Sequence, residues 1–485
     1  MSGLAREDQT IAAIATAPVS AAIGIVRVSG MSAKEIAMRI FRPKRPVHCL
    51  ESHRVYYGLI YAPVSGVFID EALVMLMQAP HSYTREDVLE IQCHGGPAVT
   101  RRILEAVLAC GAREADPGEF TRRAFLNGRI DLAQAEAVME LVTAATDLQR
   151  QAAIGALSGN MSRSIHGVRE EVVDVLARIE AELDFPEDGL EFHSATALCR
   201  SISEKILHPI HALLASYDTR HIVRDGVRVV MAGRPNTGKS SLFNGILGTS
   251  RVLVSPVPGT TRDSIEENLD INGLLVTLVD TAGIRQETSD TIESMGMDIA
   301  QREMERANHL LVLIDCSLPL THEDLHLLGS IHPGRPVTVV LNKIDLLKGP
   351  FAEPSCLQDG LNVLPVTAQI QAVLLEKGIS EAVFLPVSAK TGFGLDRLKE
   401  RIANAALSDR AVNCDFPIPT LRQRDILMKA AESFESAQDL LKNGKALEIV
   451  AIELRNGLSG LNEMLGLEAN EDVLNRIFSR FCIGK

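Results

Sequence analysis

A glycine-rich turn in the middle of this chain carries the groups that bind a phosphate. It runs Gly233-Arg-Pro-Asn-Thr-Gly-Lys-Ser240, between an apolar run at 227–232 and a helical pattern at 241–247. In a strand–turn–helix of this kind, the backbone N–H groups and the helix N-terminus converge on one anion. The spacing lets Lys239 reach the outer phosphates of a nucleotide and lets the Ser240 hydroxyl bind Mg²⁺. The residues expected to contact the nucleotide here are Asn236, Thr237, Gly238, Lys239, Ser240 and Ser241.

Two later stretches offer groups for the metal ion and the terminal phosphate. Thr261, in a loop bounded by proline and glycine, is the expected second hydroxyl ligand of Mg²⁺, and the γ-phosphate would order that loop. Asp280 follows the apolar run 274–279 and is expected to hold Mg²⁺ through a water molecule. The N–H of Gly283 is expected to bind the γ-phosphate. The second stretch as a whole is Asp280, Thr281, Ala282 and Gly283.

Two further motifs predict that the base is guanine. Asp345, in a motif that follows the strand pattern 337–341, can accept both N–H groups of the guanine edge. Adenine lacks that pair of donors and would leave the carboxylate unpaired. The backbone N–H of Ala389, after the strand pattern 383–387, would meet guanine O6. The residues of the two motifs are Asn342, Lys343, Asp345, Ser388, Ala389 and Lys390.

The order of these motifs, each after a strand, favours a guanine-nucleotide site over a generic doubly wound domain with coincidental turns. One expected group is missing. The residue after Gly283 is Ile284, where Ras-like switches carry a glutamine that orients the attacking water. Because an apolar side chain cannot do this, the catalytic polar group must come from elsewhere in the chain.

The overall composition excludes several classes of protein. With 485 residues, 46% of them hydrophobic, the chain is long enough for about three domains. A formal charge of −13 argues against a broadly basic nucleic-acid surface, although not against a local one. The eight cysteines include no CxxC pair, which fits free thiols in a reducing cytosol. The first ten residues are polar and no apolar run approaches ~18 residues, so we expect a cytoplasmic chain without a membrane span.

The hydrophobic patterns predict a multidomain fold that combines α/β and all-α parts. Residues 1–128 mix strands and helices and are expected to form an α+β domain. Residues 225–408 alternate short apolar strands with helices, which indicates a parallel sheet wrapped by helices. The flanking segments, 129–224 and 409–485, have helical periodicity. We therefore expect the α/β domain to be inserted into a discontinuous helical domain whose two halves pack together.

Nine motifs spread over the chain together have the pattern of one known family. They are the phosphate loop, Pro258-Gly-Thr-Thr-Arg-Asp263, Asp280-Thr-Ala-Gly-Ile-Arg285, Ile23-Gly-Ile-Val-Arg-Val-Ser-Gly30, Pro80-His-Ser-Tyr-Thr-Arg-Glu-Asp-Val-Leu-Glu90, Cys93-His-Gly-Gly96, Pro117-Gly-Glu-Phe-Thr-Arg-Arg-Ala-Phe-Leu-Asn-Gly-Arg129, Asp131-Leu-Ala-Gln-Ala-Glu-Ala137 and Phe481-Cys-Ile-Gly-Lys485. With them, over nearly its full length, the chain resembles the bacterial and organellar tRNA-modification GTPases called MnmE or TrmE. The resemblance implies that the inserted domain is a Ras-like P-loop GTPase domain and that the first domain binds a folate and supports dimerisation.

The resemblance implies a GTPase that K⁺ and dimerisation of the GTPase domains activate. Asn236 would be a K⁺ ligand, and a glutamate after the switch, here Glu293, would position the attacking water. From their residue types alone, Asn236 is typical of a turn and Glu293 of an exposed helix start. Backbone oxygens of Ser255, Val257 and Thr260 would complete the K⁺ site. The nucleotide-binding loop would comprise Ser255, Pro256, Val257, Pro258, Gly259, Thr260 and Thr261.

The resemblance also implies a site for 5-formyltetrahydrofolate or a related tetrahydrofolate. Its contacts would be Arg27, Glu90, Arg129 and Lys485. The cations suit the glutamyl carboxylates and Glu90 suits the donor edge of the pterin. Two departures bear on this site: residues 18–23 lack the family's glycine-rich charged stretch, and position 129 is often lysine. Cys482 is either a nucleophile near the one-carbon donor or a small apolar residue that docks the tail.

The implied activity is a tRNA modification carried out with a partner protein. A homodimer would act with an FAD-dependent MnmG (GidA) type protein in a heterotetramer or larger complex. Together they would form a 5-carboxymethylaminomethyl or aminomethyl group on the wobble uridine of certain tRNAs. One alternative is a regulatory or ribosome-assembly GTPase without modification chemistry. Another is a folate-dependent transferase with a vestigial nucleotide domain, which the complete set of nucleotide motifs disfavours.

Overall fold

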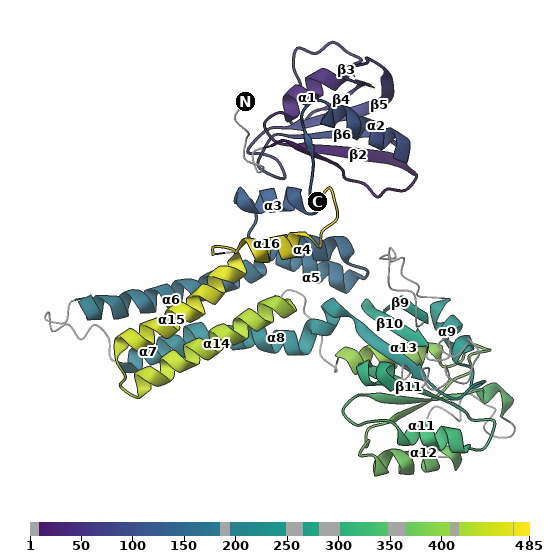
Figure 1. The fold of residues 1–485 in the computed structure, drawn as a ribbon. Helices are drawn as coiled ribbons and strands as arrows, with labels where there is room; N and C mark the ends of the chain where they lie inside the picture. The colour runs from purple at the N-terminus through teal and green to yellow at the C-terminus, as the bar shows by residue number, and fades with distance from the viewer. Residues whose placement is uncertain are drawn as a thin grey trace, which may run out of the picture. The chain divides into compact units, whose positions relative to one another are not determined.

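The computed structural model describes residues 9–184, 195–248, 265–280, 301–347, 365–407, 417–468 and 470–485 (Figure 1). The chain divides into two compact units. The first comprises Met1–Met139, Ala156–Ile210 and Asp425–Lys485, and the second comprises Glu140–Gly155 and His211–Arg424. Among the described residues, none of the helices combines the length and the apolar character that a membrane crossing needs.

A seven-stranded sheet with the order β3-β4-β5-β6-β2-β1-β7 forms the N-terminal part of the first unit. Buried and exposed residues alternate along β5, so one face of the sheet is packed and the other faces outward. Helices α1 (Ala33–Ile40) and α2 (Pro97–Leu108) contribute to the packed core. The strands are β1 (Ile11–Ile14), β2 (Ala21–Ser29), β3 (Phe41–Pro43), β4 (Val55–Tyr61), β5 (Phe68–Met77), β6 (Val88–Gly95) and β7 (Arg113–Glu114).

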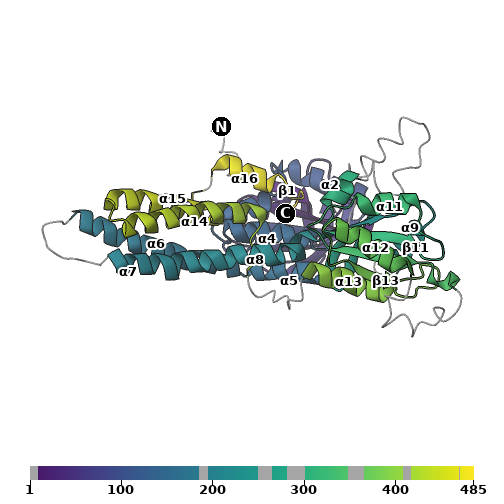
Figure 2. The same cartoon turned by 90° about the horizontal axis from the view of Figure 1, so that it is seen from below.

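The rest of the first unit is helical and joins segments from both sides of the α/β domain. Helix α6 (Asn160–Asp184) packs on α15 (Leu447–Leu465), which confirms that the two helical halves come together (Figure 2). Gly457 allows a close approach here, since a Cβ at this position would lie 2.4 Å from the Phe434 ring. The remaining helices before and after the α/β domain are α3 (Glu119–Leu126), α4 (Leu132–Thr143), α5 (Asp147–Leu157), α7 (Ala195–Ser201), η3 (Ile202–Leu207), α8 (His208–Asp225), α14 (Leu421–Lys442) and α16 (Glu471–Phe478).

The second unit contains a six-stranded sheet with the order β13-β12-β11-β8-β10-β9. All its neighbouring strands run parallel except β9, which is antiparallel to β10. Helices α9 and α13 pack on one face, and α11 and α12 pack on the other. The elements are β8 (Val227–Ala232), α9 (Lys239–Leu247), β9 (Ile265–Ile271), β10 (Leu274–Asp280), β11 (His309–Asp315), α11 (His322–Gly329), β12 (Val337–Asn342), α12 (Pro365–Glu376), β13 (Val383–Pro386) and α13 (Leu395–Leu407).

This doubly wound order confirms the predicted fold class and shows where a ligand can bind. The chain leaves β8 toward β10 on one side and reaches β11 on the other, so the strand order reverses beside β8. In such sheets ligands bind at the carboxyl ends of the strands, at the point of reversal. The phosphate loop begins there, directly after β8.

Candidate functional site

The phosphate loop joins β8 to α9 through two left-handed residues, Asn236 at φ +64° and Gly238 at φ +96°. Glycine is strongly favoured at position 238. A Cβ there would lie 2.3 Å from Nδ2 of Asn342 in addition to straining the backbone. Gly233 is also closely packed, because its Cβ would lie 2.9 Å from the carbonyl oxygen of Leu313.

The lysine predicted to reach the phosphates and the serine predicted to bind Mg²⁺ lie at the start of α9. Lys239 is buried, and its Nζ donates to the carbonyl oxygens of Gly233 at 2.7 Å and Arg234 at 2.8 Å. The Ser240 hydroxyl lies 3.5 Å from a carboxylate oxygen of Asp280, at the end of β10. A hydroxyl and a carboxylate so close together match the oxygen ligands that Mg²⁺ prefers. Of the residues predicted to hold the ion, Ser240 and Asp280 therefore lie close together, and Thr261 lies outside the described residues.

The two predicted base-recognition motifs are hydrogen bonded to each other and to the phosphate loop. The side-chain amide of Asn342 donates to the Thr237 carbonyl at 2.8 Å, and its oxygen accepts the backbone N–H of Ala389 at 3.1 Å. The Ser388 hydroxyl donates to Asp345 at 2.7 Å, which orients the carboxylate predicted to read guanine. Two further predicted contacts, Lys390 and Ser241, are neighbours of predicted site residues in the sequence, and their side chains are exposed.

Lys343 forms an ion pair at the same end of the sheet. Its backbone is left-handed, at φ +66°, and its Nζ lies 2.7 Å from a carboxylate oxygen of Asp315, at the end of β11. Burial raises the pKa of Asp315, but the hydrogen bonds from Lys343 and Ser317 outweigh it and hold that pKa below its ordinary value. The carboxylate is therefore ionised at neutral pH and fixes the motif that contains Lys343.

Several predicted contacts lie outside the described residues. They are Ser255, Pro256, Val257, Pro258, Gly259, Thr260, Thr261, Thr281, Ala282, Gly283 and Glu293.

Sequence reasoning did not identify the partner of Arg234. Nε of this phosphate-loop residue lies 3.2 Å from Oδ2 of Asp324. Asp324 belongs to the capping box of α11: it accepts the N–H of Thr321 at 3.0 Å, and its own N–H donates to the Thr321 hydroxyl. A capping box is recognisable in the sequence as Thr-x-x-Asp. The ion pair with a distant loop is not, because it depends on the tertiary fold.

A second group of predicted residues gathers on the N-terminal sheet. Arg27 on β2 and Glu90 on β6 are direct cross-strand partners, and Arg27 Nε donates to Glu90 at 2.9 Å. The other end of the guanidinium donates to the carbonyl oxygen of Gly484 at 3.0 Å. Burial, and then the positive charge of Arg27, lower the pKa of Lys485 below its ordinary value. The structure thus brings residues from the two ends of this sequence to one place.

Tyr83 is the residue of this second group that sequence reasoning missed. Its ring lies near two cations: the guanidinium carbon of Arg129 is 4.7 Å and that of Arg27 is 5.9 Å from the ring centre. Arg129 also donates to the Tyr83 carbonyl at 2.9 Å. In the sequence, the only sign of a role for Tyr83 was its position inside the motif at 80–90. Three cations, one carboxylate and an aromatic ring suit a flat ligand that carries both hydrogen-bond donors and carboxylates.

The thiols differ in their surroundings. Burial raises the pKa of Cys93 to about 11 and that of Cys316 to about 12, so both stay protonated at neutral pH. Cys482 is exposed, and its carbonyl accepts the N–H of Gly118 at 3.4 Å and that of Lys485 at 3.3 Å. Its backbone therefore helps to dock the segment that carries Lys485.

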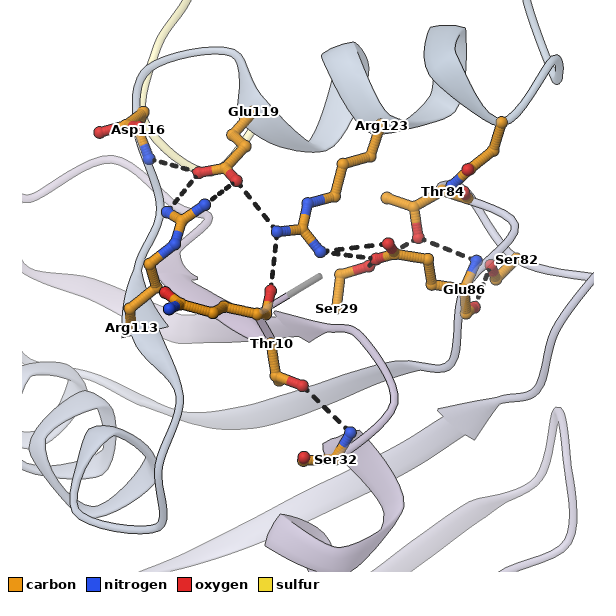
Figure 3. Close-up of polar contacts among 12 residues, drawn as sticks. Thr10, Ser29, Ser32, Ser82, Thr84, Glu86, Arg113, Asp116, Glu119 and Arg123 are labelled. Carbon is orange, nitrogen blue, oxygen red and sulfur yellow. Dashed lines mark hydrogen bonds and ion pairs between the residues drawn. The ribbon is translucent and has the colours of Figure 1, made fainter. Parts of the chain in front are cut away.

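A buried ionic network holds the segment around Tyr83 against α3 (Figure 3). Arg123, on α3, donates to Glu86 at 3.0 Å and to Glu119 at 3.0 Å, and Arg113 donates to Glu119 from β7. Ser29, on β2, donates to Glu86 at 2.7 Å. The network joins β2, β7, α3 and the loop before β6, and so fixes the loop that presents Tyr83.

Comparisons with known proteins match the whole chain. A family model described as "GTP-binding protein TrmE N-terminus" matches residues 10–129, and one described as "MnmE helical domain" matches residues 132–482. The tRNA modification GTPase MnmE of Symbiobacterium thermophilum is 42% identical over 480 residues, covering 99% of this chain and 100% of that protein. Its counterpart in Geobacter sulfurreducens is 42% identical over 483 residues, covering 99% of each. A solved structure of Aquifex aeolicus Era is 29% identical and covers 43% of this chain and 66% of its own, with a TM-score of 0.29.

Proposed function

Because this chain belongs to the MnmE family of tRNA-modification GTPases, and so is a GTP-hydrolysing enzyme of tRNA modification, we propose that K⁺ and dimerisation activate its GTPase. With an FAD-dependent MnmG-type partner, it forms the 5-carboxymethylaminomethyl or aminomethyl group on the wobble uridine of certain tRNAs. The carbon comes from a tetrahydrofolate. The observation that carries the proposal is the gathering of Glu90 and Lys485 around Arg27, and of Arg27 and Arg129 near Tyr83, in a chain that also carries a nucleotide site.

The nucleotide site binds GTP through charge and hydrogen bonds. Lys239 and the loop N–H groups would neutralise the phosphates; Ser240 and Thr261 would bind Mg²⁺ directly, and Asp280 would hold it through a water molecule. Asp345, oriented by Ser388, accepts the guanine N–H groups. The Ala389 N–H, already aligned by Asn342, donates to guanine O6.

Asn236 is proposed as the K⁺ ligand, together with backbone oxygens of Ser255, Val257 and Thr260. Its left-handed backbone lies two residues before Gly238, in the loop that is proposed to bind the phosphates. A cation there neutralises charge that develops in the transition state, the role of an arginine finger in other GTPases. Glu293 orients the attacking water, the function that Ile284 cannot perform.

The N-terminal site is proposed to bind 5-formyltetrahydrofolate or a related tetrahydrofolate. Arg27, Arg129 and Lys485 provide positive charge for the glutamyl carboxylates, and Glu90 accepts from the donor edge of the pterin. The bound folate supplies the one-carbon unit. Cys482 is exposed close to Lys485 in sequence and serves either as a nucleophile or as part of the docked segment.

The proposal divides the chain into a folate-binding and dimerisation domain at 1–128, helical halves at 129–224 and 409–485, and a GTPase domain at 225–408. Two copies associate, and the GTP cycle gates the assembly with the flavoprotein by moving the GTPase domains. The flavin and the folate carry the uridine chemistry itself.

The decisive experiment is mass analysis of wobble uridines from cells with and without this chain. We expect the 5-carboxymethylaminomethyl or aminomethyl nucleosides to disappear on deletion and to return with the wild-type gene. A complementing variant with Arg27→Ala, which spares the nucleotide site, should hydrolyse GTP and fail to restore them. Unchanged wobble nucleosides on deletion would instead favour a regulatory or ribosome-assembly GTPase.

A further inference from the structure

A short stretch of the N-terminal domain is basic although the chain as a whole is acidic. Between residues 34 and 54 there are six Lys and Arg residues against two Glu, in a chain with 49 Lys and Arg against 62 Asp and Glu. All six cationic residues are exposed. They are Lys34, Arg39, Arg42, Lys44, Arg45 and Arg54.

The fold places these cations on the edge strand β3, on the residues that follow it and on the helix that leads into it. Lys34 and Arg39 lie on α1, Arg42 lies on the edge strand β3, and Lys44 and Arg45 follow it directly. Figure 1 shows α1 and β3 beside β4 and β5 at one end of the N-terminal domain. Of the six, Arg54 is paired with a carboxylate, that of Glu51 at 3.1 Å. The other five form what we call the basic edge.

Aromatic rings support two of the cations of the basic edge. The Arg42 guanidinium carbon lies 4.4 Å from the centre of the Tyr61 ring, and Nζ of Lys44 lies 5.9 Å from that of Tyr57. The Tyr61 ring in turn packs edge-on against Phe68 at 5.9 Å. Cation–π contacts of this kind hold long side chains extended on a surface without neutralising their charge. The charge therefore remains available to an anionic partner.

A simpler reading of the basic edge is protection against strand pairing. Lys, Arg and Pro on an edge strand prevent other strands from adding to the sheet. This explains Arg42 and Pro43 on β3. It does not explain Lys34 and Arg39, which lie on a helix and not on a strand edge.

We propose that the basic edge binds the phosphate backbone of tRNA. Lysine and arginine contacts to phosphates supply most of the sequence-independent affinity of a protein for nucleic acid. A chain with a net charge of −13 repels RNA over much of its surface, so an exposed positive region decides where RNA can approach. The partner follows from the family, whose members modify tRNA. The proposal does not depend on the folate, K⁺ or flavoprotein parts of the proposed function.

The test is a salt titration of tRNA binding with the full-length protein. In one variant Arg42→Gln, Lys44→Gln and Arg45→Gln are combined. We expect its affinity for tRNA to fall at least about tenfold near 0.1 M salt, and the slope of log K against log salt to decrease by about one for each phosphate that is no longer neutralised. A control variant combines Lys377→Gln, Arg397→Gln and Lys429→Gln, which are exposed cations elsewhere, and changes the net charge equally. It should bind tRNA like the wild type.

A second variant separates RNA binding from protection of the sheet edge. Lys34→Gln with Arg39→Gln alters only exposed positions of α1 and leaves β3 intact. It should also weaken tRNA binding and reduce the salt slope, while GTP hydrolysis without RNA and the unfolding temperature stay at wild-type values. If both variants bind tRNA with wild-type affinity and slope, the proposal is wrong. It is equally wrong if they lose only the flavoprotein partner.

Discussion

The side chain of Arg234, in the phosphate loop, forms an ion pair with Asp324, a carboxylate that is only 1% exposed as a residue. The same carboxylate caps the first turn of α11. Asp324 thus links α11, on one face of the sheet, to the loop that follows β8. Through this contact Asp324 holds a residue of the phosphate loop in place, although the two residues are far apart in the sequence.

Asp324→Ala should therefore harm both stability and nucleotide affinity. Removing one partner of a buried ion pair costs about 3–5 kcal/mol, because the other charge is left without compensation. We expect a loss of this size in urea unfolding, and weaker binding of a fluorescent GTP analogue. Glu323→Ala is the matched control, since this neighbour is exposed on the same turn. Equal stability of the two variants would contradict the structural role given to the ion pair.

Gly238→Ala should abolish tight GTP binding. The substitution combines an unfavourable left-handed backbone with a Cβ 2.3 Å from Asn342 Nδ2, so both loops must shift. Gly378→Ala offers a control, because Gly378 has φ +78° but nothing within 4 Å of the added Cβ. Titration calorimetry should show a loss of GTP affinity of more than about tenfold for the first variant only, equivalent to about 1.4 kcal/mol or more. An unchanged GTP affinity in Gly238→Ala would contradict the close packing described for this glycine.

The proposed K⁺ site predicts a choice between monovalent ions. GTP hydrolysis by the wild type should be faster in K⁺ than in Na⁺ at equal ionic strength. Asn236→Gly keeps the left-handed backbone available and removes the whole side chain, including the oxygen proposed to bind K⁺. We expect this variant to bind GTP normally and to hydrolyse it at the same slow rate in both salts. A K⁺ preference that survives the substitution would exclude Asn236 as a ligand.

The two alternatives for Cys482 can be separated with Cys482→Ser. The side chain is exposed, so the substitution leaves the backbone hydrogen bonds of this residue in place. If the thiol is a nucleophile, GTP hydrolysis stays normal and the modified wobble uridine is lost, as measured by mass analysis of tRNA. A normal nucleoside profile in the variant would assign the residue to docking alone.

The network in Figure 3 predicts how acid destabilises the N-terminal domain. Burial raises the pKa of Glu119, but hydrogen bonds from Arg113, the Asp116 N–H and Arg123 together outweigh it and leave the pKa below its ordinary value of 4.5. A carboxyl group whose pKa is lowered on folding stabilises the protein above its unfolded pKa, and this stability is lost as the pH falls toward the folded pKa. Glu119→Gln should lower the urea midpoint at neutral pH.

The difference between this variant and the wild type should shrink below about pH 4.5, as Glu119 of the wild type becomes protonated. Glu114→Gln, an exposed substitution nearby, should leave the pH profile unchanged. A constant difference between pH 7 and pH 3 would show that Glu119 acts through packing and not through its charge.

Sequence patterns predicted the parts of the fold that have strong periodicity. The apolar strands of the α/β sheet and the long helices after residue 417 were recognisable because their buried faces are continuous. Strand β9 was missed, because its edge position leaves Glu266 and Glu267 at least partly accessible and hides the apolar pattern. Strands β1, β3 and β7 have two to four residues, too few for a pattern to appear.

The candidate sites, too, were predictable only where a local sequence motif defines them. Lys239, Asp345 and Ala389 were identified because local motifs fix their geometry. The ion pair of Arg234 with Asp324, and the contacts of Tyr83 with Arg27 and Arg129, join distant segments, and no local pattern encodes them. The basic edge was overlooked because net charge averages over the whole chain, whereas binding depends on where the charges lie.

Asn342 hydrogen bonds to both Thr237 and Ala389, and so ties together the loops that follow β8, β12 and β13. Binding energy from GTP is then not consumed in ordering three separate segments, so the conformational entropy lost on association is small. The same bonds make the contributions of these loops interdependent. Substitutions that weaken base recognition and substitutions that weaken phosphate recognition should therefore combine non-additively, with Asn342 as the point where their effects meet.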